Sequence, residues 1–151
     1  MKKGNPALWF AILVGAGVAA AVGIAAFLSE QPPAGPVTPV FDKQACVFCK
    51  MHVGEPRFAA QLQTRGGDVH FYDDPGCLAE HLAAERLDVH AIYFRHLHED
   101  RWVILDKAGF VPITPTPMGF GYGAVDAGAP GAIPFEAFEA KALARTRKGN
   151  Q

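Results

Sequence analysis

The sequence carries almost no net charge. Its 151 residues include 14 Lys and Arg against 15 Asp and Glu, so the formal net charge is -1 at pH 7. This composition provides no broad basic surface that could neutralise a phosphate backbone, and we do not expect nucleic acid as a partner. The length leaves room for one modest folded domain once any targeting segment is set aside.

Cysteine and methionine are scarce. The only cysteines are Cys46, Cys49 and Cys77, and the only methionines beyond the initiator are Met51 and Met118. Three cysteines cannot all pair within one chain, so at least one thiol is free or has a metal partner. A second Cys-x-x-Cys pair and a His-x-x-x-His pair are also missing, although structural zinc sites commonly use two such pairs.

Charged residues are missing from residues 7–28, which follow Lys2 and Lys3. A helix rises about 1.5 Å per residue, so this apolar run is long enough to cross a bilayer. Lysines before it and Glu30 after it predict a short cytoplasmic N-terminus at 1–6 and a single-pass anchor, with the C-terminal part on the periplasmic side. A cleaved signal peptide is the alternative, but its apolar core is usually shorter.

Proline separates the apolar run from the rest of the chain. Residues 29–40 include four prolines among small residues, which predicts an extended linker before an extracytoplasmic domain at 41–148. Four stretches of this domain have the alternation or the β-branched content of strands: 57–64, 69–72, 89–96 and 101–106. A further chain reversal is expected at Lys107-Ala108-Gly109.

Two helices are predicted in the domain. Asp74 can cap a helix that begins at Pro75 and runs to Leu87, and a second apolar face predicts a helix over 134–147. Residues 114–131 are rich in Pro and Gly, which favours a functional loop without regular structure. The sum is an α+β fold: a small antiparallel sheet with helices, after one transmembrane helix.

The stretch CVFCKMH, residues 46–52, places two thiols, a thioether and an imidazole close together. A dithiol redox centre would need a long helix after Cys46, which Gly54 and Pro56 disfavour. Structural zinc lacks its second ligand pair. A Cys46–Cys49 disulfide with Met51 as core filler stays open. Cu(I) suits thiolate and thioether sulfur, so Met51 favours copper, and His52 is the best placed of the six histidines.

Two further sulfur atoms are candidates outside this stretch. Met118 lies between Pro117 and Gly119, where it is either a ligand or a hydrophobic plug. Cys77 lies on the first turn of the predicted helix, where unpaired amides favour a thiolate. It could join the ligands, resolve an oxidised neighbouring cysteine, or fill space. The predicted metal ligands are Cys46, Cys49, Met51, His52, Cys77 and Met118.

Several segments resemble the NosL family, copper-binding accessory proteins of nitrous oxide reductase maturation. They are, in chain order, CVFCKM, RFAAQL, FYDDPGCL, WVILD, TPMGFGYGA and IPFEAFEA, which span about Cys46 to Ala142. The resemblance implies a Cu(I) metallochaperone and not an enzyme, with a fold similar to that of organomercurial lyases, built from two ββα-type units. It also places Cys46, Cys49, Met51 and Met118 on the family's sulfur positions, and Cys77 on its Gly-Cys helix start.

The implied partners are a copper-receiving enzyme, either nitrous oxide reductase or another cuproenzyme such as a terminal oxidase, and a copper-donating transporter. Family members are commonly lipoproteins, whereas no cysteine follows the apolar run closely here, so the predicted tether is the helix itself. Two other functions stay open at this point. One is an extracytoplasmic thiol–disulfide oxidoreductase that uses Cys46 and Cys49, and the other is a structural zinc-binding domain.

Overall fold

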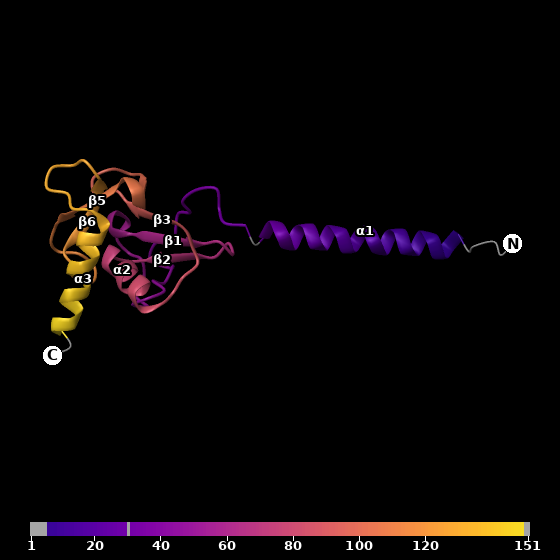
Figure 1. Cartoon of the computed structure of the whole chain (residues 1–151), viewed down its shortest axis with the longest axis horizontal. Coiled ribbons are helices and arrows are strands. Elements are labelled where there is room, and N and C mark those ends of the chain that lie inside the picture. Colours follow the sequence, from indigo (N-terminus) through magenta and orange to yellow (C-terminus); the bar gives the residue numbers. More distant parts are fainter. Residues whose placement is uncertain (1–5, 30, 150–151) are drawn as a thin grey trace. The chain divides into compact units, whose positions relative to one another are not determined.

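The computed structural model describes residues 6–29 and 31–149, which divide into a helical N-terminal unit and a folded domain that begins at Pro32 (Figure 1). The N-terminal unit contains the helix α1 (Pro6–Ser29), where the sequence predicts a membrane span at 7–28. Within the described residues, however, no helix is both long and apolar enough to cross a membrane. The predicted cytoplasmic segment at 1–6 lies, except for Pro6, outside the described residues.

The domain is α+β with a small antiparallel sheet, as predicted. The sheet has the order β2-β1-β3-β4, and β5 and β6 form a separate antiparallel pair. The strands are β1 (Ala60–Thr64), β2 (Val69–Tyr72), β3 (Val89–Arg95), β4 (Trp102–Ile104), β5 (Ala108–Pro112) and β6 (Tyr122–Asp126). The helices are α2 (Pro75–Ala84) and α3 (Phe135–Gly149), with short 3-10 turns at Pro56–Phe58 and Leu105–Lys107. A hairpin followed by a helix therefore occurs twice, as β1-β2-α2 and as β5-β6-α3.

The prediction of an irregular loop over 114–131 is wrong, because β6 forms there. The turn predicted at 107–109 lies earlier, in the 3-10 turn Leu105–Lys107, because β5 begins at Ala108. Glycine is the reason for both errors. A Cβ added to Gly123 would lie 2.8 Å from the Leu97 side chain, and one added to Gly109 would lie 2.8 Å from Cβ of Ala132. These glycines permit close packing inside strands and do not mark turns.

The linker at 29–40 is not an extended spacer over its whole length. Val37 donates its N–H to the Gln61 side chain at 2.9 Å and accepts from the same amide at 2.8 Å, and Gln63 donates to the Gly35 carbonyl at 2.8 Å. Both glutamines are fully buried. They alternate with the core residues of β1, so their amides leave the opposite face of the strand to hold the linker. The folded domain therefore begins before Phe41.

The core packs aromatic rings from the second hairpin against the last helix. Phe110 of β5 stacks on Phe138 of α3 with ring centroids 4.4 Å apart, and meets Phe94 of β3 edge to face at 4.9 Å. The buried cluster continues through β1 and α2 to Cys46 and Cys77. The two thiols are therefore part of the continuous hydrophobic core, and the rest of the fold fixes their positions.

Candidate metal centre

Cys46, Cys49 and Cys77 form a cluster, hereafter the thiol cluster. Their sulfur atoms lie within 4.8 Å of one another, and all three thiols are free. Cys46 and Cys77 have exposed fractions of 0% and 1%, while Cys49 is half-buried. In the described part of the chain, no carboxylate or imidazole joins them at this spacing. The cluster is thus a compact three-sulfur site that opens to solvent beside Cys49.

A tight turn positions the first two sulfurs. The Cys46 N–H donates to the Met51 carbonyl at 2.8 Å, and the Lys50 N–H donates to the Cys46 carbonyl at 3.1 Å. Lys50 adopts a left-handed φ of 66°, which reverses the chain instead of continuing a helix. The Val47 N–H donates to the Phe71 carbonyl at 3.0 Å and joins the turn to β2. As the sequence predicts, no helix follows Cys46.

The N-terminus of α2 positions the third sulfur. Asp74 accepts from the Gly76 N–H at 2.9 Å, and Pro75 occupies the first helical position, which confirms the predicted cap. The same Asp74 carboxylate accepts the Met118 N–H at 3.2 Å. Gly76 faces the ring of Phe120, because an added Cβ would lie only 2.0 Å from a ring carbon. The loop around Met118 therefore packs directly on the helix turn that carries Cys77.

Hydrogen bonds and burial shift the pKa values of the three cysteines in different directions. The Cys77 thiol donates to Cys46, and this bond, together with backbone N–H groups of Asp73, Cys49 and Phe48, lowers the Cys46 pKa from 9.0 to about 5 despite its burial. The bond to Cys46, followed by burial, raises the pKa of Cys77, and burial is the main cause that raises the pKa of Cys49. The fold therefore favours the thiolate form at Cys46 and the thiol form at Cys49 and Cys77.

Comparison of this chain with protein families, with curated proteins and with solved structures found no match. The resemblance to the NosL family therefore stays a prediction from the sequence.

The other predicted ligands lie in different surroundings. The Met51 side chain is 59% exposed, and His52 is exposed in a β-bridge with Ala45. Met118 is half-buried and packs against the core that contains Cys46 and Cys77. Among the four predicted Cys and His ligands, the structure thus brings the three cysteines together, and His52 is not part of the thiol cluster.

A polar chain that the sequence does not predict runs from the buried Tyr72 of β2 through the buried His81 of α2 to Glu85 at the surface. The Tyr72 hydroxyl lies 2.8 Å from Nδ1 of His81, whose Nε2 lies 3.4 Å from the Glu85 carboxylate. Burial raises the pKa of Tyr72, and negative charge at Cys46 raises it further. The ring of Phe48 packs 6.0 Å from that of His81. The spacing of His81 and Glu85 by one helical turn is a signal that could have indicated their pairing, but nothing local points to Tyr72.

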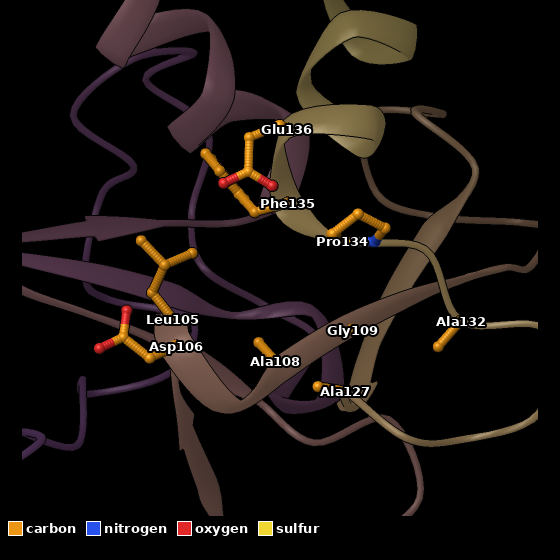
Figure 2. A pocket seen from close by; sticks show the side chains of 9 residues that line it. All are labelled: Leu105, Asp106, Ala108, Gly109, Ala127, Ala132, Pro134, Phe135 and Glu136. Atoms are coloured by element: carbon orange, nitrogen blue, oxygen red, sulfur yellow. The ribbon is translucent and has the colours of Figure 1, made fainter.

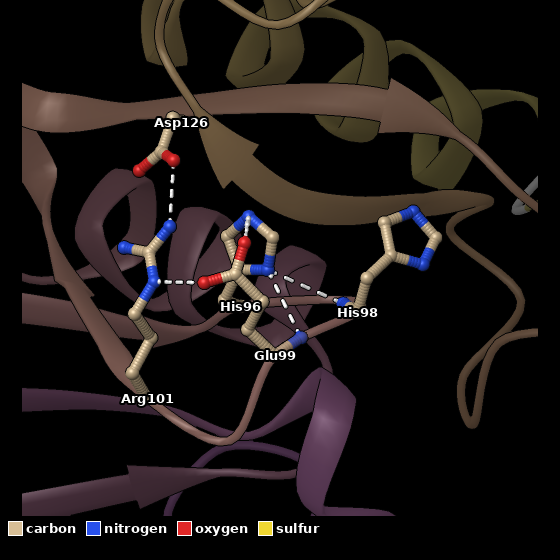
Figure 3. Close-up of polar contacts among 5 residues, drawn as sticks. All are labelled: His96, His98, Glu99, Arg101 and Asp126. Atoms are coloured by element: carbon tan, nitrogen blue, oxygen red, sulfur yellow. Dashed lines mark hydrogen bonds and ion pairs between the residues drawn. The ribbon is translucent and has the colours of Figure 1, made fainter.

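A second group of possible ligands, His96, Glu99 and Asp126, is an ion-pair cluster (Figure 3). Arg101 lies between the two carboxylates, 2.6 Å from each, and lowers the pKa of both. Nδ1 of His96 accepts the N–H groups of His98 and Glu99, so its proton is on Nε2, the nitrogen that faces Glu99. A guanidinium thus takes the place that a cation would occupy.

A cavity of about 280 Å³ lies between β5 and the start of α3 (Figure 2). Its lining includes two carboxylates, from Asp106 and Glu136, and is otherwise apolar or backbone. It contains no thiol, imidazole or basic side chain. Soft-metal chemistry therefore belongs to the thiol cluster and not to this cavity.

Proposed function

We propose that this chain is an extracytoplasmic Cu(I)-binding metallochaperone, and not an enzyme, that delivers copper to a cuproenzyme. The observation that supports the proposal is the thiol cluster: three free sulfurs within 4.8 Å of one another, with one of them reachable from solvent. Cu(I) is a soft ion that prefers such thiolate ligands. The recipient that the family resemblance implies is nitrous oxide reductase.

The number of ligands favours copper over structural zinc. Structural zinc sites are almost always closed by four ligands from Cys and His. Here the described residues offer three thiols without a fourth imidazole or carboxylate at the same spacing. A low coordination number also suits transfer, because an open position lets a partner's ligand bind the ion before the old bonds break.

Accessibility indicates the direction of exchange. Cys46 and Cys77 are buried, so an ion can enter or leave only beside Cys49. Phe48 and Met51 flank that cysteine and are 37% and 59% exposed. We propose that an acceptor protein docks on this rim, and that the exposed Met51 thioether is a transient ligand during exchange. Anchoring through residues 7–28 and loading by a copper-donating transporter remain predictions from the sequence.

The same accessibility disfavours a thiol–disulfide oxidoreductase. Such an enzyme needs an exposed nucleophilic cysteine with a lowered pKa. In this chain the thiol with the lowered pKa is Cys46, which is fully buried. The accessible thiol is Cys49, whose pKa is raised. Solvent exposure and a lowered pKa, which such an enzyme needs on one cysteine, are therefore found on two different cysteines.

Competition for Cu(I) tests the proposal. The full-length reduced protein is titrated with Cu(I) under anaerobic conditions against a chromophoric Cu(I) chelator, beside Cys46→Ser and Cys77→Ser variants. We expect one tightly held Cu(I) in the wild type and at least about a tenfold loss of affinity in each variant. Wild-type affinity equal to that of the Cys46→Ser variant would refute copper binding by the cluster.

A further inference from the structure

The thiol cluster has a property that a Cu(I) carrier does not require. Two sulfurs are enough for linear Cu(I), yet three converge here, from a turn and from the first turn of α2. In the described residues no fourth nitrogen or oxygen ligand completes a tetrahedron. Three thiol sulfurs without a nitrogen or oxygen ligand beside them match an element that forms three bonds to sulfur and keeps a lone pair in the fourth direction.

Trivalent arsenic is such an element. Its neutral hydroxide reacts with thiols to form a pyramid of three arsenic–sulfur bonds. The fold is suited to this product, because Cys46 and Cys77 are fixed in the core while Cys49 lies at the opening. A neutral ligand can approach the opening without the cost of bringing a charged ion into a buried site.

We propose that Cys46, Cys49 and Cys77 together bind one arsenite molecule as a three-coordinate thiolate complex. The proposal rests on the same thiol cluster as the proposed function, and it implies that arsenite and Cu(I) exclude each other. The site would then bind neutral trivalent hydroxides of thiophilic elements as well as soft monovalent cations.

The exchange balances without an oxidant or a reductant. Three As–O bonds break and three As–S bonds form, and arsenic stays trivalent throughout. Each of the three departing hydroxides takes one thiol proton, from Cys46, Cys49 and Cys77. Three water molecules leave.

Two arsenic compounds distinguish a three-sulfur site from a simple dithiol. Arsenite can form three bonds to sulfur, whereas phenylarsine oxide keeps its carbon substituent and can form only two. The full-length reduced protein is titrated with each under anaerobic conditions. Near-ultraviolet absorption reports As–S bonds, intact-protein mass reports stoichiometry, and a thiol reagent counts the cysteines that remain.

With arsenite we expect saturation at one equivalent, a mass gain of one arsenic less three hydrogens, and no reactive thiol. With phenylarsine oxide we expect one thiol to stay reactive. Cys77→Ser and Cys49→Ser should each bind arsenite at least about tenfold more weakly. Because Cys49 is half-buried, the second variant keeps the core intact if the first fails to fold. A reactive thiol left by arsenite, or unchanged affinity in the Cys49→Ser variant, would overturn the proposal.

Copper separates this inference from the proposed function. The same preparation is tested for Cu(I) in the chelator competition, with and without bound arsenite. Cu(I) binding without arsenite binding refutes only the arsenite site, and arsenite binding without Cu(I) binding refutes only the copper carrier. If both bind, bound arsenite must prevent copper uptake, and simultaneous binding would contradict a shared site.

Discussion

The thiol of Cys77 donates a hydrogen bond to the sulfur of Cys46, and this is the largest single cause of the low pKa of Cys46. The two cysteines belong to different elements, the turn before β1 and the first turn of α2. The core brings them together, so the acidity of Cys46 is a property of the fold and not of the local sequence. The fold therefore favours the thiolate form of Cys46, the form that binds an incoming metal ion.

Replacing Cys77 by Ala removes this hydrogen bond donor, so we expect the pKa of Cys46 to rise from about 5 toward its ordinary value of 9.0. Thiolate absorption followed against pH measures it in the reduced protein. Cys49→Ala is the comparison: it retains the Cys49 backbone N–H and removes a weaker side-chain hydrogen bond to Cys46, so we expect a smaller rise of the Cys46 pKa. If the lowest thiol pKa is the same in the Cys77→Ala variant as in the wild type, the bond does not control Cys46.

Stability should depend on pH through the same thiolate. Cys46 has a folded-state pKa of about 5 and an ordinary value of 9.0. Its ionisation therefore stabilises the fold fully above about pH 9, and this contribution is lost as the pH falls through about 5. The raised pKa values of Cys49 and Cys77 act in the opposite direction above their ordinary value of 9.0.

We therefore expect the free energy of unfolding of the reduced wild type, relative to Cys46→Ser, to increase between about pH 5 and about pH 8. Urea unfolding at several pH values under reducing conditions measures both proteins. A difference that stays constant over this range would mean that Cys46 is not ionised in the folded state.

Met51 and Met118 differ in burial, so Ala substitutions at the two positions can be compared directly. Met51 is 59% exposed, whereas Met118 packs against the core. We expect Met118→Ala to lower the free energy of unfolding by about 1–3 kcal/mol, less than a fully buried site would lose, and Met51→Ala to change it by less than about 0.5 kcal/mol. Met51→Ala should instead slow the transfer of Cu(I) to a chelator. Urea unfolding and stopped-flow transfer measure the two effects, and equal destabilisation by both would contradict the packing described.

Local signals in the sequence predict the first half of the domain well. The range of β2 and the cap at Asp74 agree with the structure, because alternation and capping are properties of neighbouring residues. The second hairpin was missed because Gly109 and Gly123 look like turn residues, and only distant partners such as Leu97 explain them. Cys77 was a candidate ligand on its own, but its distance to Cys46 depends on how the core packs.

The linker illustrates the same limit and leads to a prediction. The alternation of residues in β1 places Gln61 on the face opposite the core, where a polar side chain is expected. The linker covers this face, so Gln61 is fully buried. Gln61→Leu would leave the Val37 N–H and carbonyl without partners in a part-buried place, at a cost of about 1–3 kcal/mol. Limited proteolysis should then cut near Val37 faster than in the wild type, while Gln31→Leu, which changes an exposed glutamine, should have no effect. Unchanged cleavage in Gln61→Leu would show that the linker is not held by this side chain.

Gly76 connects the Met118 loop to the thiol cluster. An added Cβ would lie 2.0 Å from the Phe120 ring, so Gly76→Ala must displace that ring or the helix turn that carries Cys77. We expect a loss of about 1–3 kcal/mol in the free energy of unfolding, as for other overpacked sites. Cu(I) affinity should fall as well, because Cys77 follows Gly76 directly. Gly66→Ala is the control, since its nearest side-chain atom would be 3.8 Å from the new Cβ. Urea unfolding and chelator competition decide the matter: full copper affinity in a destabilised Gly76→Ala protein would show that the position of Cys77 does not depend on this contact.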